Sequence, residues 1–335
     1  MYKFFQSPIW KDIKTLVYGD QSFSITLFDQ EYRGIVKEKK IWPVATSWFQ
    51  VLGVELPSNN IDRVREEVER AYHDYHGSWR NIFMQRGITN EIIRFYNVAH
   101  RSPSFAPGMQ QTRQRIERWL HEETGLVSSF RENMPLANII IDISKDDTAL
   151  LKEMNSWCKD RVRKSIHHGI TFRSADASEY DHFYDEWSKI VNLKNFHNIS
   201  RTTFHRLMHY LKTNNCGDIF VAYKDNDMLG GSIAVYDDTS ITYLYGFSNR
   251  DPQYRNIGVH HFLKFKMFTR GRERWLHYCD LFGGAPTGYD EHPLTSVSKF
   301  KESLGGTKIE WYGNYDIILN PRLYTFFKTY HNIRK

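Results

Sequence analysis

Cysteine is scarce in this chain of 335 residues, which contains only Cys158, Cys216 and Cys279. The three lie far apart and none is part of a CxxC pair, so we expect neither a disulfide framework nor a zinc site. A fold that does not depend on disulfides is typical of a reducing compartment. The cysteine content therefore predicts a cytoplasmic protein.

Long apolar segments are missing as well. No run approaches the ~18 consecutive apolar residues that would predict a membrane-spanning helix. Residues 1–6 read Met-Tyr-Lys-Phe-Phe-Gln and lack the extended apolar core of a secretory signal. We therefore expect neither a secretory signal nor a transmembrane helix.

Several motifs of catalysis and ligand binding are also absent. The sequence has no P-loop and no GxSxG segment, which argues against the corresponding nucleotide-binding and hydrolase folds. His205 and His209 stand four residues apart, but no glutamate follows the first histidine as HExxH requires, and no third ligand is evident. We predict no metal site.

Aromatic side chains and positive charge are abundant. Aromatic residues make up 15% of the chain, and the formal net charge is +6 at pH 7. The aromatic rings suit a binding cleft or, equally well, a core of large side chains. The basic balance favours anionic partners such as nucleic acid, phosphates or an anionic membrane face, although many soluble enzymes reach it without one.

Hydrophobic periodicity and turn residues predict a regular order of elements between residues 144 and 310. We expect a helix at 144–168, a strand at 170–172, helices at 177–193 and 202–213, strands at 219–223, 229–235 and 241–247, a helix at 254–269 and a strand at 275–281. Two helices, a three-strand meander, a helix and a strand form the element order of a GNAT acyltransferase domain.

The first part of the chain predicts a similar mixture. We expect a helix ending near residue 18, strands at 22–28, 32–37 and 48–52, helices at 61–73 and 113–124, and a buried strand at 138–143. The length suggests about two domains. An α+β protein of two such domains fits both observations.

The most informative segment is Phe300-Lys301-Glu302-Ser303-Leu304-Gly305-Gly306, which follows Asp280-Leu281-Phe282-Gly283-Gly284-Ala285-Pro286. We expect Lys301 on a short helix beside a glycine-bearing loop that leaves a strand. A cation there can stabilise an anionic substrate or a developing oxyanion, and glycines allow a backbone to approach a ligand closely. A solvated surface lysine would produce the same local pattern.

Short motifs recur in a characteristic order along nearly the whole chain. They are Gln6-Ser7 with Trp10 and Lys14, Ser129 to Pro135, Lys159 to Gly169, Asp280 to Pro286, His292-Pro293, Phe300-Lys301, Leu304-Gly305-Gly306 and Gly313-Asn314-Tyr315-Asp316. No one of them is specific. In this order and spacing they resemble the Fem family of tRNA-dependent aminoacyltransferases, which form peptidoglycan bridges.

The resemblance implies an α+β fold of two tandem GNAT-like domains around a cleft. We expect the first domain to comprise residues 1–143 plus 311–335, and the second residues 144–310. No part of the second domain is long enough for the helical-hairpin arm that some members carry, so we expect no long coiled-coil arm. The final helix, from Pro321 to about Tyr330, would fold back onto the first domain.

The resemblance also implies the reaction. An amino acid would pass from aminoacyl-tRNA to the stem-peptide amine of a peptidoglycan precursor, either UDP-MurNAc-pentapeptide or lipid II. Gly, Ala and Ser are each compatible as the transferred residue, and no metal or organic cofactor is implied. Peripheral contact with the inner face of the cell membrane is also compatible with this role.

Roles for individual residues follow from the same resemblance. Lys301 falls where the family places a lysine near the transferred ester, and Asp280 is a candidate to orient the incoming amine, although an acid at a strand end often only caps a turn. Lys14 and Arg201 fall where the family holds a diphosphate, which suits the arginine fork. Further substrate-binding candidates are Tyr243, Tyr245, Gly283, Gly284 and Phe300.

A basic helix is the candidate tRNA contact. Lys159, Arg161, Arg163 and Lys164 are accompanied only by Asp160 within six residues. Such a patch could follow a phosphate backbone or could simply be a solvated helix face.

An acyltransferase that uses acyl-CoA and a small amine is the alternative function. In such enzymes the helix after the meander opens with R/Q-x-x-G-x-G/A and binds pyrophosphate at its N-terminus. Here the segment is Arg255-Asn256-Ile257-Gly258-Val259-His260. We expect the bulky His260 to obstruct phosphate binding. A third possibility is a protein that binds tRNA or a cell-wall precursor without catalysis.

Overall fold

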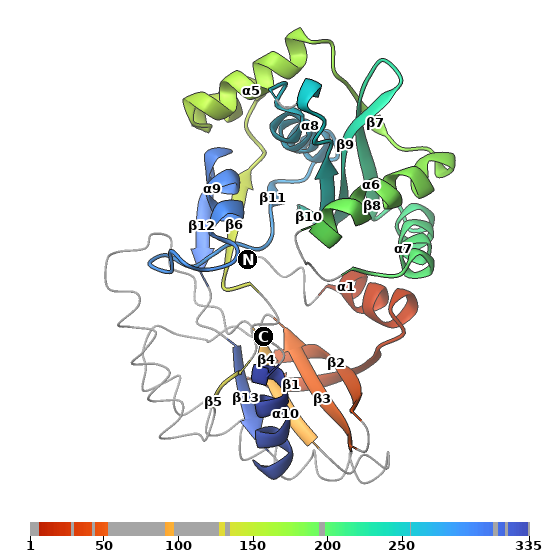
Figure 1. Ribbon diagram of the computed structural model, residues 1–335, viewed down its shortest axis with the longest axis vertical. Coiled ribbons are helices and arrows are strands. Elements are labelled where there is room, and N and C mark those ends of the chain that lie inside the picture. The colour runs from red at the N-terminus through yellow and green to blue at the C-terminus, as the bar shows by residue number, and fades with distance from the viewer. Residues whose placement is uncertain are drawn as a thin grey trace. The chain divides into compact units, whose positions relative to one another are not determined.

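The structure is a computed structural model, and it describes residues 7–27, 30–41, 44–52, 91–96, 127–130, 135–193, 198–254, 256–310, 314–318 and 321–333. The chain divides into two compact units (Figure 1). The first comprises Met1–Leu136, Pro286–Gly288 and Glu310–Lys335, and the second comprises Ala137–Ala285 and Tyr289–Ile309. The helices predicted at residues 61–73 and 113–124 lie outside the described residues.

The first unit contains a six-stranded sheet in the described residues, with the order β1-β2-β3-β4-β13-β5. Its strands are β1 (Gln21–Leu27), β2 (Gln30–Ile41), β3 (Val44–Leu52), β4 (Glu91–Tyr96), β13 (Asn314–Ile318) and β5 (Val127–Ser128). Neighbours are antiparallel except for the parallel pair β3 and β4. The three strands predicted near the N-terminus are confirmed as β1, β2 and β3, whereas β4, β5 and β13 were not predicted.

Helices α1 and α10 also belong to the first unit. Helix α1 (Pro8–Asp12) begins at Ser7, whose Oγ accepts a hydrogen bond from the Trp10 N–H at 3.1 Å, and a π-helical turn follows. In α10 (Pro321–Ile333), the Tyr324 hydroxyl donates to a buried carboxylate oxygen of Asp316 on β13 at 3.1 Å. The last helix thus packs on the sheet of the first unit, as predicted.

The second unit contains a seven-stranded sheet in the described residues, with the order β12-β6-β11-β10-β9-β8-β7. Its strands are β6 (Ala137–Asp142), β7 (Thr171–Ser174), β8 (Gly217–Lys224), β9 (Asp227–Tyr236), β10 (Ser240–Ser248), β11 (Tyr278–Asp280) and β12 (Thr307–Glu310). Its helices are α4 (Asp147–Glu153), α5 (Ser156–His167), α6 (Tyr180–Leu193), α7 (Arg201–Thr213), α8 (Val259–Glu273) and α9 (Thr295–Ser303). The predicted meander is confirmed as β8, β9 and β10.

The helix predicted at residues 144–168 is in fact two helices. Met154 is extended, with ψ 149°, and it separates α4 from α5. The side chain of Asn155 then accepts a hydrogen bond from the Cys158 N–H at 2.8 Å and caps α5. Because asparagine satisfies the free N–H groups of a first turn, it favours a new helix start here. The prediction missed this cap.

Helix α8 begins later and ends later than predicted. Gly258 has φ +89°, a left-handed conformation that favours glycine, so the helix starts only at Val259. It continues beyond Gly271, where a Cβ atom would lie 2.6 Å from Ile143 Cδ1 and 2.8 Å from Ile241 Cγ2. This glycine therefore permits close packing of α8 on the sheet and does not end the helix.

Strand β6 belongs to the second unit, although the prediction placed residues 138–143 in the first domain. It pairs antiparallel with β11, which in turn runs parallel to β10. The pairing partner is about 140 residues away in the sequence, so local pattern could not assign the strand to its sheet.

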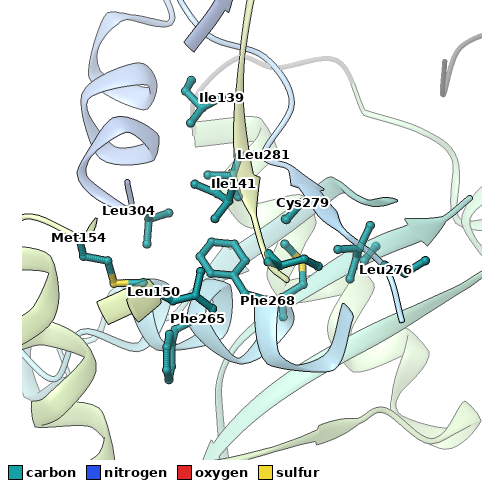
Figure 2. Close-up of a cluster of buried hydrophobic side chains, with 14 of the residues drawn as sticks. Ile139, Ile141, Leu150, Met154, Phe265, Phe268, Leu276, Cys279, Leu281 and Leu304 are labelled. Carbon is teal, nitrogen blue, oxygen red and sulfur yellow. The ribbon is translucent and has the colours of Figure 1, made fainter. Parts of the chain in front are cut away.

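The core of the second unit joins these strands to α4, α5 and α8. Figure 2 shows side chains from β6, β11, α4 and α8 packed together, with Leu304 from the end of α9 among them. Cys158, Cys216 and Cys279 are all buried. The packing fixes the end of α9 against β6 and thereby positions the loop that follows β11.

Strands β10 and β11 pair only over Ser240–Thr242 and Tyr278–Asp280. Strand β10 then continues to Ser248, with a bulge between Tyr243 and Tyr245, while the chain after Asp280 leaves as a loop. Where β10 and β11 separate, the neighbouring side chains come from α8, α9 and this loop. They include the candidate site residues.

The longest helix in the described part of the second unit is α8, with 15 residues. That part of the chain contains no helical-hairpin arm, in agreement with the prediction. Among the described residues, no helix is both long and apolar enough to cross a membrane.

We predict that Gly306→Ala destabilises the protein more than Gly169→Ala. Both glycines have positive φ, but a Cβ at residue 306 would lie 2.5 Å from Ile140 O, whereas none lies within 4 Å at residue 169. We expect a loss of ~1 kcal/mol for Gly169→Ala and of ~3 kcal/mol or more for Gly306→Ala. Urea unfolding followed by circular dichroism measures both, and equal losses would contradict the steric argument.

Candidate functional site

Lys301 lies on α9 with its amine buried beside the loop after β11. Its Nζ donates hydrogen bonds to the carbonyl oxygens of Phe282 and Gly283, the latter at 2.6 Å. The side chain is only 6% exposed. Lys301 is therefore a fixed, desolvated cation and not the solvated surface lysine that its local sequence also allowed.

The loop is shaped to present these two carbonyls. Phe282 and Gly283 have φ +48° and +62°, two successive left-handed residues. Asp280 is fully buried; it accepts hydrogen bonds from the Asn138 side-chain amide and the Phe282 N–H, both at 2.7 Å. Asp280 thus holds the turn that binds Lys301, and its predicted part in orienting the amine stays a prediction.

Gly284 continues the loop along β6. A Cβ at this position would lie 3.0 Å from Ser298 Oγ and 3.1 Å from Ile139 Cδ1. The Ser298 hydroxyl also accepts a hydrogen bond from the Ala285 N–H, which ties the loop to α9. Gly284 therefore permits close packing of α9 against the loop.

Burial alters the protonation of Lys301. Loss of hydration lowers the pKa of Lys301 from 10.5 to about 8, while the nearby Asp280 charge acts in the opposite direction. The amine is thus mostly charged at neutral pH and yet within reach of deprotonation. A group of this kind can stabilise negative charge and can also give up a proton.

A second buried lysine, Lys264, was not predicted. It lies on α8 with no exposed surface; its Nζ donates to Ser232 Oγ at 2.8 Å and lies 3.1 Å from the centroid of the Tyr243 ring. The Lys301 Nζ lies 5.9 Å from the same ring. Burial lowers the pKa of Lys264 well below 10.5, and the charge of Lys301 adds to that effect.

The sequence did contain a signal that Lys264 is buried. Residues 262–268 read Phe-Leu-Lys-Phe-Lys-Met-Phe, which is apolar on nearly all sides of a helix. Such a helix is buried all round, so a lysine within it cannot keep its amine in water. Tyr243, predicted as a substrate-binding residue, has its ring near both amines.

Phe300 packs beside Lys301 against two histidines. Its ring centroid lies 4.4 Å from that of His260 and 4.9 Å from that of His261. Burial lowers the pKa of His261 to about 4, and the charge of Arg161 contributes, so this ring is neutral at pH 7. Tyr245 lies in a different aromatic group, 5.0 Å from Trp187.

The two predicted diphosphate ligands belong to different units. Lys14 lies in the first unit, 3.8 Å from Asp20, with its amine over the Trp10 and Tyr18 rings. Arg201 lies in the second unit and binds the carboxylates of Asp181 and Asp185. Their roles stay predictions, and Arg201 would have to exchange carboxylate partners for a phosphate.

His205 and His209, which we did not expect to bind metal, belong to no group of potential metal ligands among the described residues. His205 Nε2 instead lies 3.0 Å from Asp181 Oδ1, beside Arg201.

The basic residues predicted to bind tRNA are spread around α5. Lys164 and Arg163 are exposed, whereas Lys159 and Arg161 are half-buried. Arg163 lies 3.9 Å from Asp160, and Arg161 donates to the backbone oxygen of Asn256 at 2.7 Å. Arg161 therefore ties α5 to the segment that opens α8.

Helix α5 covers the N-terminal end of α8. A Cβ at Gly258 would lie 2.6 Å from Arg161 O and 2.8 Å from Arg161 Cα. Ser165 Oγ also donates to Ile257 O at 2.9 Å. GNAT acyltransferases bind the CoA pyrophosphate at this helix end. The backbone of α5 therefore lies against this helix end. His260, which we expected to obstruct phosphate binding, packs on Phe300, and its effect on phosphate stays a prediction. Arg255 lies outside the described residues.

Comparison with known proteins agrees with this architecture. Residues 153–291 match the family model of the acetyltransferase (GNAT) domain. A search of curated protein sequences finds no significant match. The second unit therefore has a GNAT acyltransferase fold.

Solved structures extend the likeness to both units. The chain is similar to a crystal structure of FemX, with 15% identity, a TM-score of 0.69, and coverage of 97% of this chain and 94% of that one. A structure of L-PGS from Bacillus licheniformis has 12% identity, covers 97% and 96% of the two chains, and has a TM-score of 0.49. The chain thus has the tandem GNAT-like α+β fold of FemX, and the resemblance to the Fem family is confirmed for the fold.

We predict that the stability difference between the wild type and Lys301→Met depends on pH. Below about pH 8 the amine is charged in both states, and its burial destabilises the folded protein. Between pH 8 and 10.5 the unfolded chain binds the additional proton, so this cost disappears. The wild type should gain ~3 kcal/mol relative to the variant between about pH 7 and 11. Urea unfolding across this range provides the measurement, and a constant difference would contradict the burial of a charged amine.

A second prediction concerns Lys264→Met, which replaces a fully buried amine by an apolar chain of similar length. The variant loses one hydrogen bond, to Ser232, but removes the cost of desolvating the amine. We expect its thermal midpoint to equal or exceed that of the wild type. Lys266→Met, at a half-buried position on the same helix, serves as the control. A loss of ~3 kcal/mol or more would show that the amine has a structural role.

Proposed function

We propose that this protein is an aminoacyltransferase. It moves an amino acid from aminoacyl-tRNA to the stem-peptide amine of a peptidoglycan precursor. The observation that carries the proposal is the buried Lys301 cation, held by two backbone carbonyls on a GNAT scaffold whose CoA-binding helix end is covered. The fold of FemX and the ordered motifs support the same reaction class.

The reaction requires mainly that the protein position the two substrates and stabilise negative charge. The acceptor amine attacks the ester carbonyl of the aminoacyl group, a C–N bond forms, and the ester C–O bond to the ribose breaks. One proton leaves the amine and one is delivered to the departing ribose oxygen. Because the ester is already activated, the main contribution is stabilisation of the tetrahedral oxyanion and the leaving oxygen.

Lys301 is suited to this task. An ammonium group has three donors, and Phe282 and Gly283 accept two, so one remains for the oxyanion or the ribose oxygen. With a pKa of about 8, the amine can also give its proton to the leaving oxygen and recover one from solvent. A donor of this kind is worth ~10²–10³ in rate.

The remaining predicted residues fill supporting roles in this proposal. Lys14 of the first unit and Arg201 of the second each contact phosphate groups of the acceptor, and Tyr245, Gly283 and Gly284 are further substrate-binding residues. The acceptor is a UDP-linked or lipid-linked stem peptide, and the protein works in the cytoplasm, where a lipid-linked acceptor would bring it to the membrane face.

An acyl-CoA transferase is the second candidate, because residues 153–291 match the acetyltransferase (GNAT) model. The position of α5 argues against it. An acyl-CoA would need the N-terminal end of α8, where the Arg161 backbone leaves room only for a glycine.

We expect the wild-type protein, given a pool of charged tRNAs, to add one aminoacyl unit to UDP-MurNAc-pentapeptide or to lipid II, as measured by mass spectrometry. Lys301→Met should lower the rate ~10²-fold or more by removing the donor to the oxyanion. Lys299→Met, an exposed position on the same helix, should retain wild-type activity.

RNase treatment of the donor must abolish the mass gain. No gain on either acceptor with intact charged tRNA would overturn the proposal, and a gain with acetyl-CoA instead would favour the second candidate. Equal transfer rates for Lys299→Met and Lys301→Met would show that Lys301 does not contribute to the chemical step.

A further inference from the structure

Trp157 is a large aromatic side chain that the core does not use. It lies in the first turn of α5 and is 53% exposed. The opposite face of α5 is buried through Cys158, Val162 and Ser165. These contacts hold the helix in place, so the exposure of Trp157 follows from the fold and not from a frayed helix end.

Trp157 is connected to the Lys301 site by packed aromatic rings. Its ring meets that of His261 edge to face at 4.7 Å, and His261 in turn meets Phe300 at 4.9 Å. Phe300 directly precedes Lys301. The centroids of the Trp157 and Phe300 rings are therefore at most about 10 Å apart, with the His261 ring in contact with both.

Positive charge accompanies the exposed ring. The Arg161 guanidinium carbon lies 5.2 Å from the centre of the Trp157 ring, and Lys164 lies one further turn along the same face of α5. Nearby carboxylates already have partners: Asp160 faces Arg163, and Glu153 binds Lys145. His261 is neutral at pH 7, so it adds no charge of its own.

We propose that Trp157 is the stacking platform for the single-stranded 3′ end of the RNA donor, and that Arg161 and Lys164 contact its phosphates. The inference rests on the proposed function, because it gives the donor its path to Lys301. An aromatic face beside cations is the arrangement with which proteins bind single-stranded nucleic acid, since bases stack on the ring while the backbone meets the charges.

The test measures binding of a fluorescently labelled single-stranded RNA that carries the 3′ sequence of a tRNA. Trp157→Ala should weaken binding ~10-fold, and Trp157→Phe should restore most of it because an aromatic face remains. Trp275→Ala is the matched control, since Trp275 is 88% exposed in the same unit and lies outside this path. Binding should also weaken as salt concentration rises.

The transfer assay separates this inference from the proposed function. Trp157→Ala should raise the KM for charged tRNA ~10-fold while kcat stays within about two-fold, because stacking contributes to donor binding and not to the chemical step. If the wild type transfers amino acids and Trp157→Ala matches it in KM and RNA affinity, the platform is overturned and the proposed function stands. If RNA binding depends on Trp157 but no acceptor gains mass, the platform stands and the proposed reaction is overturned.

Discussion

The hydrogen bonds from the Lys301 amine to the carbonyls of Phe282 and Gly283 are the constraint on which the candidate site depends. A desolvated ammonium group is costly, and here the dipoles of two backbone carbonyls compensate part of that cost. They can do so only because Phe282 and Gly283 both adopt left-handed conformations. Asp280 stabilises this turn by accepting a hydrogen bond from the Phe282 N–H. The loop, the end of α9 and strand β6 must therefore form together for the cation to be held.

The second unit combines a GNAT scaffold with a close contact between α5 and the start of α8. The match over residues 153–291 identifies the scaffold, but the N-terminal end of α8 lies against the backbone of α5. The side chains of Lys264, Tyr243 and Lys301 meet beyond the short ladder between β10 and β11. Fold alone does not assign function, so the proposal depends on the contacts that α5 and α9 make on this scaffold.

Local chemistry predicted much of the fold. The meander β8–β10 followed from apolar runs and turn residues, and Asp225 has the positive φ of such a turn. Three features were not predicted correctly: the break at Met154, the late start of α8 after Gly258, and the place of β6 in the second sheet. The first two depend on caps that are weak signals in sequence, and the third depends on pairing with a strand about 140 residues away.

The sequence by itself determined the α+β class of the chain, its order of motifs and the choice of Lys301 as a candidate residue, because glycines and a lysine at fixed spacing are visible without coordinates. Only the tertiary structure decided that Lys264 is buried beside Tyr243, that α5 covers the start of α8, and that Trp157 reaches Phe300 through His261. Each of these depends on which faces of distant elements pack together. Burial and desolvation arise from that packing, and no local pattern encodes them.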